Sequence, residues 1–312
     1  MNFNVNQKIG AEFKLIVRKS SDNAISSETE FFTNLVLDTG LNRMNVGRWI
    51  DRCCVGAGNS TPIITQTALD TFIASTLVKQ NPTTAIGTVS PCFYSVTLTW
   101  RFAAGIATGN LSEVGLGWGD TNLWNRSLIK DINGNPTTIT ILADEYLDVI
   151  SVIKVYPSEL ISGAFNLVDK NDNLISSHSY SGIPYLTTDG LGSSFEAVNI
   201  GASRLDVGFV VYSGTKGQNT TSLPTGQITS ITAGKKITRS GRTSKNAILF
   251  DLNTGNSIAH KSIYAGVGGV VTTPTIDANS CGYQIEFTPA LRIKLPTQTM
   301  IYNLSITWGR IT

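Results

Sequence analysis

Residues 112–157 read SEVGLGWGDTNLWNRSLIKDINGNPTTITILADEYLDVISVIKVYP, and this stretch decides how we expect the chain to fold. A glycine-rich run leads into a mixed apolar and polar segment, and two extended runs follow at 137–142 and 146–156. Asn133-Gly134 lies between alternating hydrophobic residues, which indicates a hairpin turn because both residues tolerate positive φ. The stretch therefore predicts consecutive short strands.

The same stretch also carries three short motifs: S-E-x-G-L-G from Ser112, N-L-x-x-R-x-L-I-K-D-x-x-G-N-P-T-T-I-T from Asn122, and D-E-x-L-D-V from Asp144. They resemble a segment found in structural proteins of tailed bacteriophage virions. V-G-x-G-N-x-T-P from Val55 and the closing residues 287–310 resemble the same family. The resemblance implies a virion or tail protein without a chemical role.

The composition favours a β-rich protein with few charges. Of 312 residues, 41% are hydrophobic and only 15% are charged, against about a quarter in ordinary proteins. The net charge of +2 gives no reason to expect a general nucleic-acid or anionic-membrane binder. Apolar runs fall short of the roughly 20 residues that cross a bilayer. The first residues lack a signal-peptide pattern, so we expect the chain to be assembled in a host cytoplasm.

Strand patterns recur along the whole chain. In residues 95–102, Val96, Leu98, Trp100 and Phe102 alternate with polar residues, which predicts a half-buried antiparallel strand. Many short strands between turn residues favour two β-sandwich or jelly-roll-like domains. We expect them at residues 1–157 and 163–312, with one short capped helix near residues 66–76. Two competing alignments of similar strands leave an internal duplication open: residues 142–155 match 295–308, or residues 94–100 match 302–308.

Catalytic and metal-binding signatures are absent from the sequence. The four cysteines have no CxxC spacing and the two histidines lie far from them, which argues against a zinc site. The acidic residues Asp144, Glu145 and Asp148 lie at an expected turn and strand start, where charges usually face water. The Asp- and Asn-rich turns at 131–135 and 169–173 fail the EF-hand pattern. We therefore predict a protein that is not an enzyme and needs no metal or cofactor.

The candidate partner-binding residues fall into two groups. Residues 234–245 hold the chain's one concentration of basic residues, which could contact an acidic partner, a neighbouring subunit or an anionic polysaccharide, or form a solvated loop. Trp118 and Trp124 are the tryptophans expected nearest a surface or interface. The basic residues of this segment are Lys235, Lys236, Arg239, Arg242 and Lys245.

These observations predict a structural component of a phage particle that acts by assembly with other virion proteins and with copies of itself. The tail is the expected location, and a tail fibre, the baseplate, the neck or a capsid decoration are the alternatives. A module that binds host-surface glycans, or a hydrolase of such glycans, are the competing functions. We expect no membrane partner, and nucleic acid is disfavoured because no aromatic residues are interleaved with the basic ones.

Overall fold

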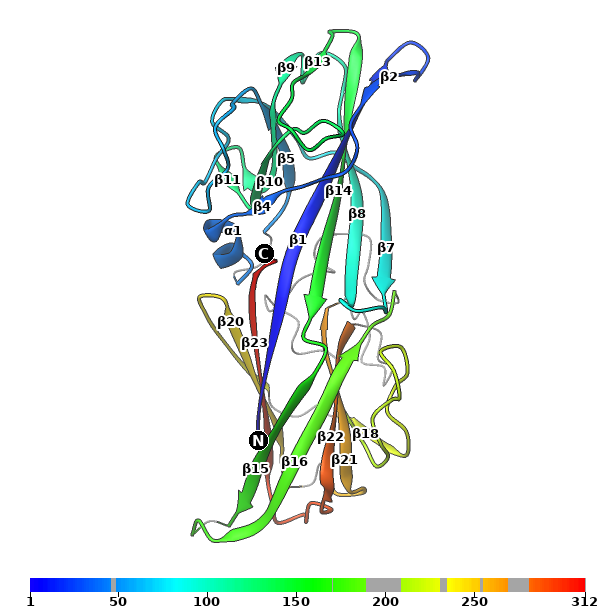
Figure 1. The fold of residues 1–312 in the computed structure, drawn as a ribbon. Helices are drawn as coiled ribbons and strands as arrows, with labels where there is room; N and C mark the ends of the chain where they lie inside the picture. Colours follow the sequence, from blue (N-terminus) through cyan, green and yellow to red (C-terminus); the bar gives the residue numbers. More distant parts are fainter. Residues whose placement is uncertain are drawn as a thin grey trace.

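The computed structural model describes residues 1–45, 49–169, 171–188, 209–230, 235–252, 255–268 and 281–311. Within these residues the chain is mainly β, with a single short helix, as the sequence predicts. Several sheets lie along one elongated molecule, and the first and last strands of the chain pair in the largest of them (Figure 1).

The largest sheet has nine strands among the described residues and takes strands from both halves of the chain. Its order is β19–β20–β23–β1–β14–β8–β7, and β2 and β3 also pair with β1. The strands are β1 (Asn2–Lys19), β2 (Ile25–Glu28), β3 (Phe32–Thr33), β7 (Lys79–Gly87), β8 (Phe93–Phe102), β14 (Glu145–Pro157), β19 (Lys235–Ser240), β20 (Thr243–Phe250) and β23 (Met300–Arg310).

Strand β1 lies in the middle of this sheet and extends from the lower part of the molecule to the upper part (Figure 1). It pairs antiparallel with β14 along Gln7–Lys19 and parallel with β23 along Asn2–Ile9. The predicted boundary falls between β14 and β15, where the chain enters another sheet. Because β19, β20 and β23 return to the large sheet, residues 1–157 and 163–312 share it. Whether either segment folds alone stays a prediction.

Three smaller sheets accompany the large one. The first has the order β4–β12–β10–β5–β6 with β11 beside β10, the second pairs β9 with β13, and the third has the order β15–β16–β22–β21–β17–β18. Their strands are β4 (Leu35–Val36), β5 (Arg52–Gly56), β6 (Phe72–Thr76), β9 (Gly109–Leu111), β10 (Glu113–Gly119), β11 (Asn122–Leu123), β12 (Asn125–Leu128), β13 (Ile139–Ile141), β15 (Ile161–Val168), β16 (Leu174–Tyr185), β17 (Phe209–Tyr212), β18 (Ile228–Ser230), β21 (His260–Gly268) and β22 (Cys281–Leu291).

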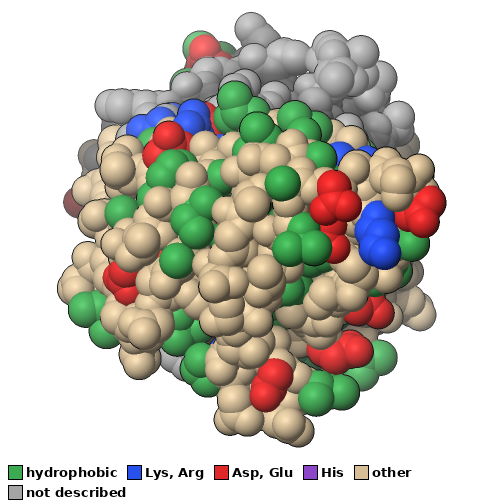
Figure 2. All heavy atoms as spheres, turned by 90° about the horizontal axis from the view of Figure 1, so that it is seen from above, with side chains coloured by type: hydrophobic (Ala, Val, Ile, Leu, Met, Phe, Trp, Pro, Cys, Tyr) green, Lys and Arg blue, Asp and Glu red, His purple; other side chains and the backbone are tan. Residues whose placement is uncertain are grey.

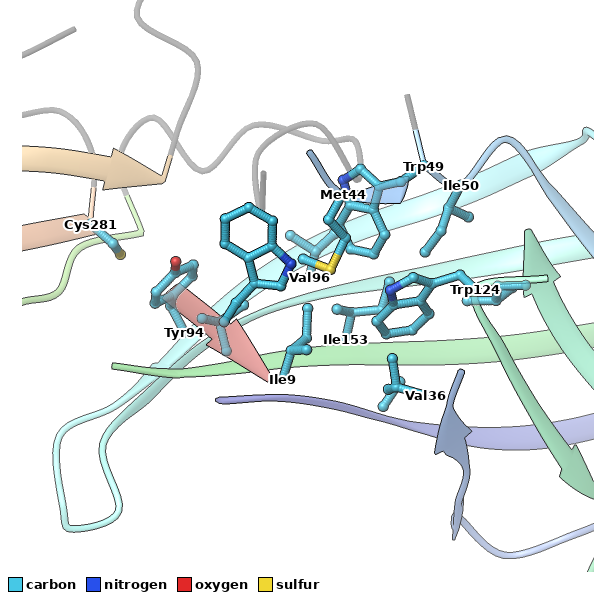
Figure 3. Packing of buried hydrophobic residues seen from close by; sticks show 14 of the residues in the cluster. Ile9, Val36, Met44, Trp49, Ile50, Tyr94, Val96, Trp124, Ile153 and Cys281 are labelled. Atoms are coloured by element: carbon cyan, nitrogen blue, oxygen red, sulfur yellow. The ribbon is translucent and has the colours of Figure 1, made fainter. Parts of the chain in front are cut away.

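One continuous hydrophobic core connects these layers. In the part of the molecule that is uppermost in Figure 1, Trp49 and Trp124 pack with Val36 and Ile153 (Figure 3). The centres of the two tryptophan rings lie 5.0 Å apart. In the lower part, Tyr302 of β23 packs against the rings of β17 and β22. The alternation predicted for β8 is confirmed on the apolar side, whose four side chains are buried, but Ser95 and Thr99 on the polar side are buried as well.

The helix prediction near residues 66–76 is wrong. Residues 72–76 form strand β6, and the helix is α1 (Asp38–Arg43). Asp70, which the pattern placed inside a capped helix, instead accepts hydrogen bonds from Ser60 and Arg126. Tertiary partners therefore satisfy the polar groups that suggested a helix.

The turn at Asn133-Gly134 is confirmed, but it does not join a two-stranded hairpin. Gly134 has φ +81°, and the Asp131 carboxylate accepts the backbone N–H groups of Asn133 and Asn135. Beyond an isolated bridge from Lys130 to Pro136, the flanking strands separate: β12 pairs with β10 and β4, and β13 pairs with β9.

Candidate interaction surface

The outer side of the lower part of the large sheet is a regular array of amides and hydroxyls, which we call the polar face. It arises from strict alternation: the side chains of Phe3 and Val5 point into the core, so those of their neighbours point outward. The register places Asn2 opposite Asn303, Asn4 opposite Ser305 and Asn6 opposite Thr307.

Hydrogen bonds fix parts of this array. Asn303 donates from Nδ2 to Oδ1 of Asn2 over 2.8 Å, and the Thr307 hydroxyl donates to Oδ1 of Asn6. Because these amides are held in place, the polar face presents a defined pattern of donors and acceptors to a partner.

The polar face continues onto the β19–β20 hairpin, where it is hollowed. Lys245 lies opposite Ser305 on one side and Thr238 on the other. Two hollows of about 470 and 300 Å³ share Thr238 and Lys245 among their lining residues. Arg239 lines the smaller hollow. The sheet therefore brings basic side chains to the edge of a hydrogen-bonding surface.

The predicted basic residues lie on β19, β20 and the turn between them, and Arg242 differs from Arg239 and Lys245 in its surroundings. Lys235 and Lys236 lie in β19, but their side chains are outside the described part of the structure. Arg239 and Lys245 are exposed. Arg242 points back to the protein and donates to Asp38 over 2.7 Å and to Asn42 over 3.0 Å. Arg242 is therefore a structural contact.

The prediction that Trp124 lies near a surface or interface is wrong. Its side chain has no exposed surface and packs against Trp49 (Figure 3). Trp118 is half-buried, with the Arg43 guanidinium 5.4 Å from the centre of its ring. Only Trp118 of this pair lies where a partner can reach it.

Asp38, the first residue of α1, connects the N-terminal part of the chain to two segments of the C-terminal part. It accepts hydrogen bonds from Arg242 of the β19–β20 turn and from Arg310 of β23. These bonds, from Arg310 first and Arg242 second, hold the pKa of the Asp38 carboxyl below its usual value. Trp308 of β23 donates to the carbonyl of Leu41 over 2.8 Å, next to this cluster. Sequence patterns alone gave no signal for this junction.

A buried ionic network fixes the loop at 57–71 and was also missed. Arg126 and Glu113 are fully buried, and Nε of Arg126 donates to Oε2 of Glu113 over 2.8 Å. The same guanidinium donates to Asp70 over 2.6 Å. Glu113 also accepts backbone N–H groups of Gly58 and Thr71, each over 2.8 Å. The motifs that begin at Val55, Ser112 and Asn122 thus meet in one network, which holds the loop in place.

Of the three acidic residues expected to face water, Asp144 is exposed as expected, but Asp148 and Glu145 are buried. Asp148 is 5% exposed and accepts two hydrogen bonds from Arg101, of 2.7 and 2.6 Å. Glu145 is also 5% exposed and accepts the N–H of Leu142 over 2.9 Å. Hydrogen bonds from Ser26 and Leu142 lower the pKa of Glu145. The expectation of solvated carboxylates is wrong for these two residues.

Both histidines are buried and engaged by neighbours. His260 lies 2.6 Å from the Tyr302 hydroxyl through Nδ1 and 3.0 Å from the Gly255 carbonyl through Nε2. His178 contacts the Pro289 carbonyl and the Ser176 hydroxyl, each over 2.8 Å. The four cysteines are buried and unbridged. Within the described ranges no cluster of metal-ligating side chains occurs, and no helix there could span a membrane.

No family model matches this chain, and neither a curated protein nor a solved structure matches it.

Proposed function

We propose that this protein is a non-enzymatic structural component of a tailed-phage virion, most simply of the tail, that works by joining its subunits together. The sequence motifs support the virion assignment, and one structural observation supports the mode of action. That observation is the open edge of β15 in the lower sheet (Figure 1).

Strand β15 presents an unprotected edge. Among the residues that the structure describes, it pairs with β16 on one side only, and its sequence ISGAFNLV has neither a charge nor a proline over eight residues. The adjoining ends of β15 and β16 carry exposed apolar side chains: Val168 is 48% exposed, Leu174 61% and Ile175 47%. Unpaired backbone groups on such an edge readily accept another strand.

The edges of the large sheet are protected in ways that β15 is not. Strand β7 carries Lys79 and Pro82 and has an irregular register between Gln80 and Thr83. Strand β19 carries three basic residues in six positions. Proteins use such charges, prolines and irregularities to prevent edge-to-edge pairing. The contrast supports β15 as the edge that a neighbouring subunit completes.

The polar face offers a second contact of different character. A flat surface of fixed amides and hydroxyls matches another polar protein surface, where hydrogen bonds and bridging water supply complementarity. The low charge of the chain supports this reading, since only 15% of its residues are charged. At the upper end of the molecule, Figure 2 shows mainly uncharged and hydrophobic groups with a few acidic and basic side chains.

The test is to find the protein in purified particles and to disturb the edge. Mass spectrometry and electron microscopy with a labelled chain should locate it at repeated, symmetric positions. Ala164→Lys adds a charge at an exposed position on β15, and we expect it to abolish incorporation. Ala85→Lys makes the same change on β7 and serves as the matched control. Absence of the protein from intact particles would refute the proposal.

A further inference from the structure

A second hollow lies on the outer side of the upper part of the large sheet, far from the polar face along β1. Its volume is about 380 Å³, within the usual range of small-ligand sites. We call it the upper pocket. Its lining residues come from β1, β7, β8, β14 and the turn after β1: Ile16, Arg18, Asn23, Asn81, Thr99, Arg101, Tyr146, Asp148 and Ile150.

Cross-strand pairing assembles this pocket from separate parts of the chain. Asp148 lies opposite Arg101, Ile150 opposite Thr99, and Tyr146 opposite Arg18. The turn at 20–24 stands on one side, and Asn81, inside the irregular part of β7, stands on the other. The flat sheet is thereby turned into a concave site.

The charged groups of the upper pocket are held rigidly. Arg101 donates Nε and Nη2 to the nearly buried Asp148, and its guanidinium lies 4.5 Å from the centre of the Tyr146 ring. Arg18 donates Nη1 to the Asn23 carbonyl over 3.0 Å, and its Nε lies 3.8 Å from Asp148. Two cations thus share one carboxylate, which leaves the pocket with an excess of positive charge.

The neutral polar groups of the pocket are two amides, a hydroxyl and a phenol, and both amides belong to residues with positive φ. Of the three non-glycine residues with positive φ in the described structure, two line this pocket: Asn23 at 62° and Asn81 at 49°. Such conformations cost energy and gather where a side chain must be aimed. Tyr146 donates its hydroxyl to the side chain of Asn23 over 2.9 Å.

We propose that the upper pocket binds one unit of an acidic saccharide, with the sugar carboxylate against Arg18 and Arg101. The excess cation matches the carboxylate, because guanidinium groups recognise such oxygens well. The amides of Asn23 and Asn81 and the hydroxyl of Thr99 match the sugar hydroxyls. This function goes beyond assembly and does not depend on it.

The test is titration of the full chain with glucuronate, followed by calorimetry or by chemical shifts. Saturable binding is expected, with glucose binding about tenfold more weakly because it lacks the carboxylate. Acetate and inorganic phosphate test the charge alone. If either binds as tightly as glucuronate, or if glucuronate does not bind, the proposal is overturned.

Two variants locate the site. Arg18→Gln should weaken glucuronate binding about tenfold, since it removes a charged hydrogen-bond donor. Asn81→Gly removes the amide yet suits the positive φ, so the fold is preserved and binding should fall several-fold. Asp172→Gly, at the third positive-φ residue, makes the same kind of change outside the pocket. Unchanged affinity in both pocket variants, or an equal loss in Asp172→Gly, would contradict this site.

Discussion

The side chain of Arg126 is fully buried, and its positive charge stabilises the buried negative charge of Glu113. Replacing it with methionine leaves a buried carboxylate without its cation, which typically costs about 3–5 kcal/mol. We expect Arg126→Met to lower the free energy of unfolding by that amount in urea titrations, with the loop at 57–71 losing amide protection first.

Two comparisons make this expectation specific. Glu113→Gln combined with Arg126→Met removes both charges and should recover part of the lost stability. Arg52→Met breaks a pair with Asp120 that is much more exposed, so it should cost less than about 1 kcal/mol. Equal losses in Arg126→Met and Arg52→Met would contradict the assigned role of the buried network.

His260 should make stability depend on pH in a defined window. Its burial lowers the pKa of the imidazole in the folded protein, so the unfolded chain binds the proton more readily. The free energy of unfolding should therefore fall as the pH drops below about 6.5, the ordinary histidine pKa. Urea titrations from pH 8 to 5 should show this fall, and His260→Gln should reduce it. An unchanged slope in that variant would contradict the assignment.

At the residue scale, the sequence did not predict that the side chains of Asp148 and Trp124 are buried, because their partners are distant in the chain. Asp148 was expected to face water because it follows a turn, yet its partner Arg101 comes from a strand 47 positions away. Trp124 was expected near a surface because of its glycine-rich neighbours, and Trp49 covers it instead. Such partners are chosen by strand register across sheets, which local patterns do not contain.

At the scale of elements, glycines in β10 let neighbouring backbone approach closely. A Cβ built on Gly117 would lie 2.0 Å from the carbonyl oxygen of Asn122, whereas one on Gly134 would meet nothing within 4 Å. We expect Gly117→Ala to cost about 2–3 kcal/mol through displaced backbone. Gly134→Ala should cost about 1 kcal/mol, from its positive φ alone. Thermal and urea unfolding would measure both, and a larger loss at Gly134 would refute this explanation.

Elements with long, regular alternation were predictable, and short ones were not. The patterns of β8 and β14 identified real strands because one side of each faces the core along many residues. The expected helix at 66–76 rested on two polar residues and a few apolar ones. Asp70 found stronger partners in Arg126 and Ser60, so local propensity lost to tertiary contacts.

At the scale of the whole molecule, β1 and β23 make the two parts of the chain interdependent. Strand β23 pairs with β1 and places Tyr302, Leu304, Ile306 and Trp308 in the core, with at most 4% of each exposed. The sequence suggested that the closing residues resemble an earlier strand, but it could not show that they pair with the first one. Pairing between strands from opposite ends of the chain produces no periodic pattern in the sequence.

This arrangement predicts that a chain ending at residue 299 loses structure in both parts. Each of the four buried side chains of β23 contributes about 1.5–3 kcal/mol, a sum comparable to the whole stability of an ordinary domain. We expect the full chain to melt in one transition and the shortened chain to show none, by circular dichroism and amide exchange. Ending at residue 309 instead removes Arg310 but keeps the core, and should cost only about 1 kcal/mol. If the chain ending at residue 299 keeps native exchange protection in β8 and β14, residues 1–157 fold independently and the shared sheet is not essential to them.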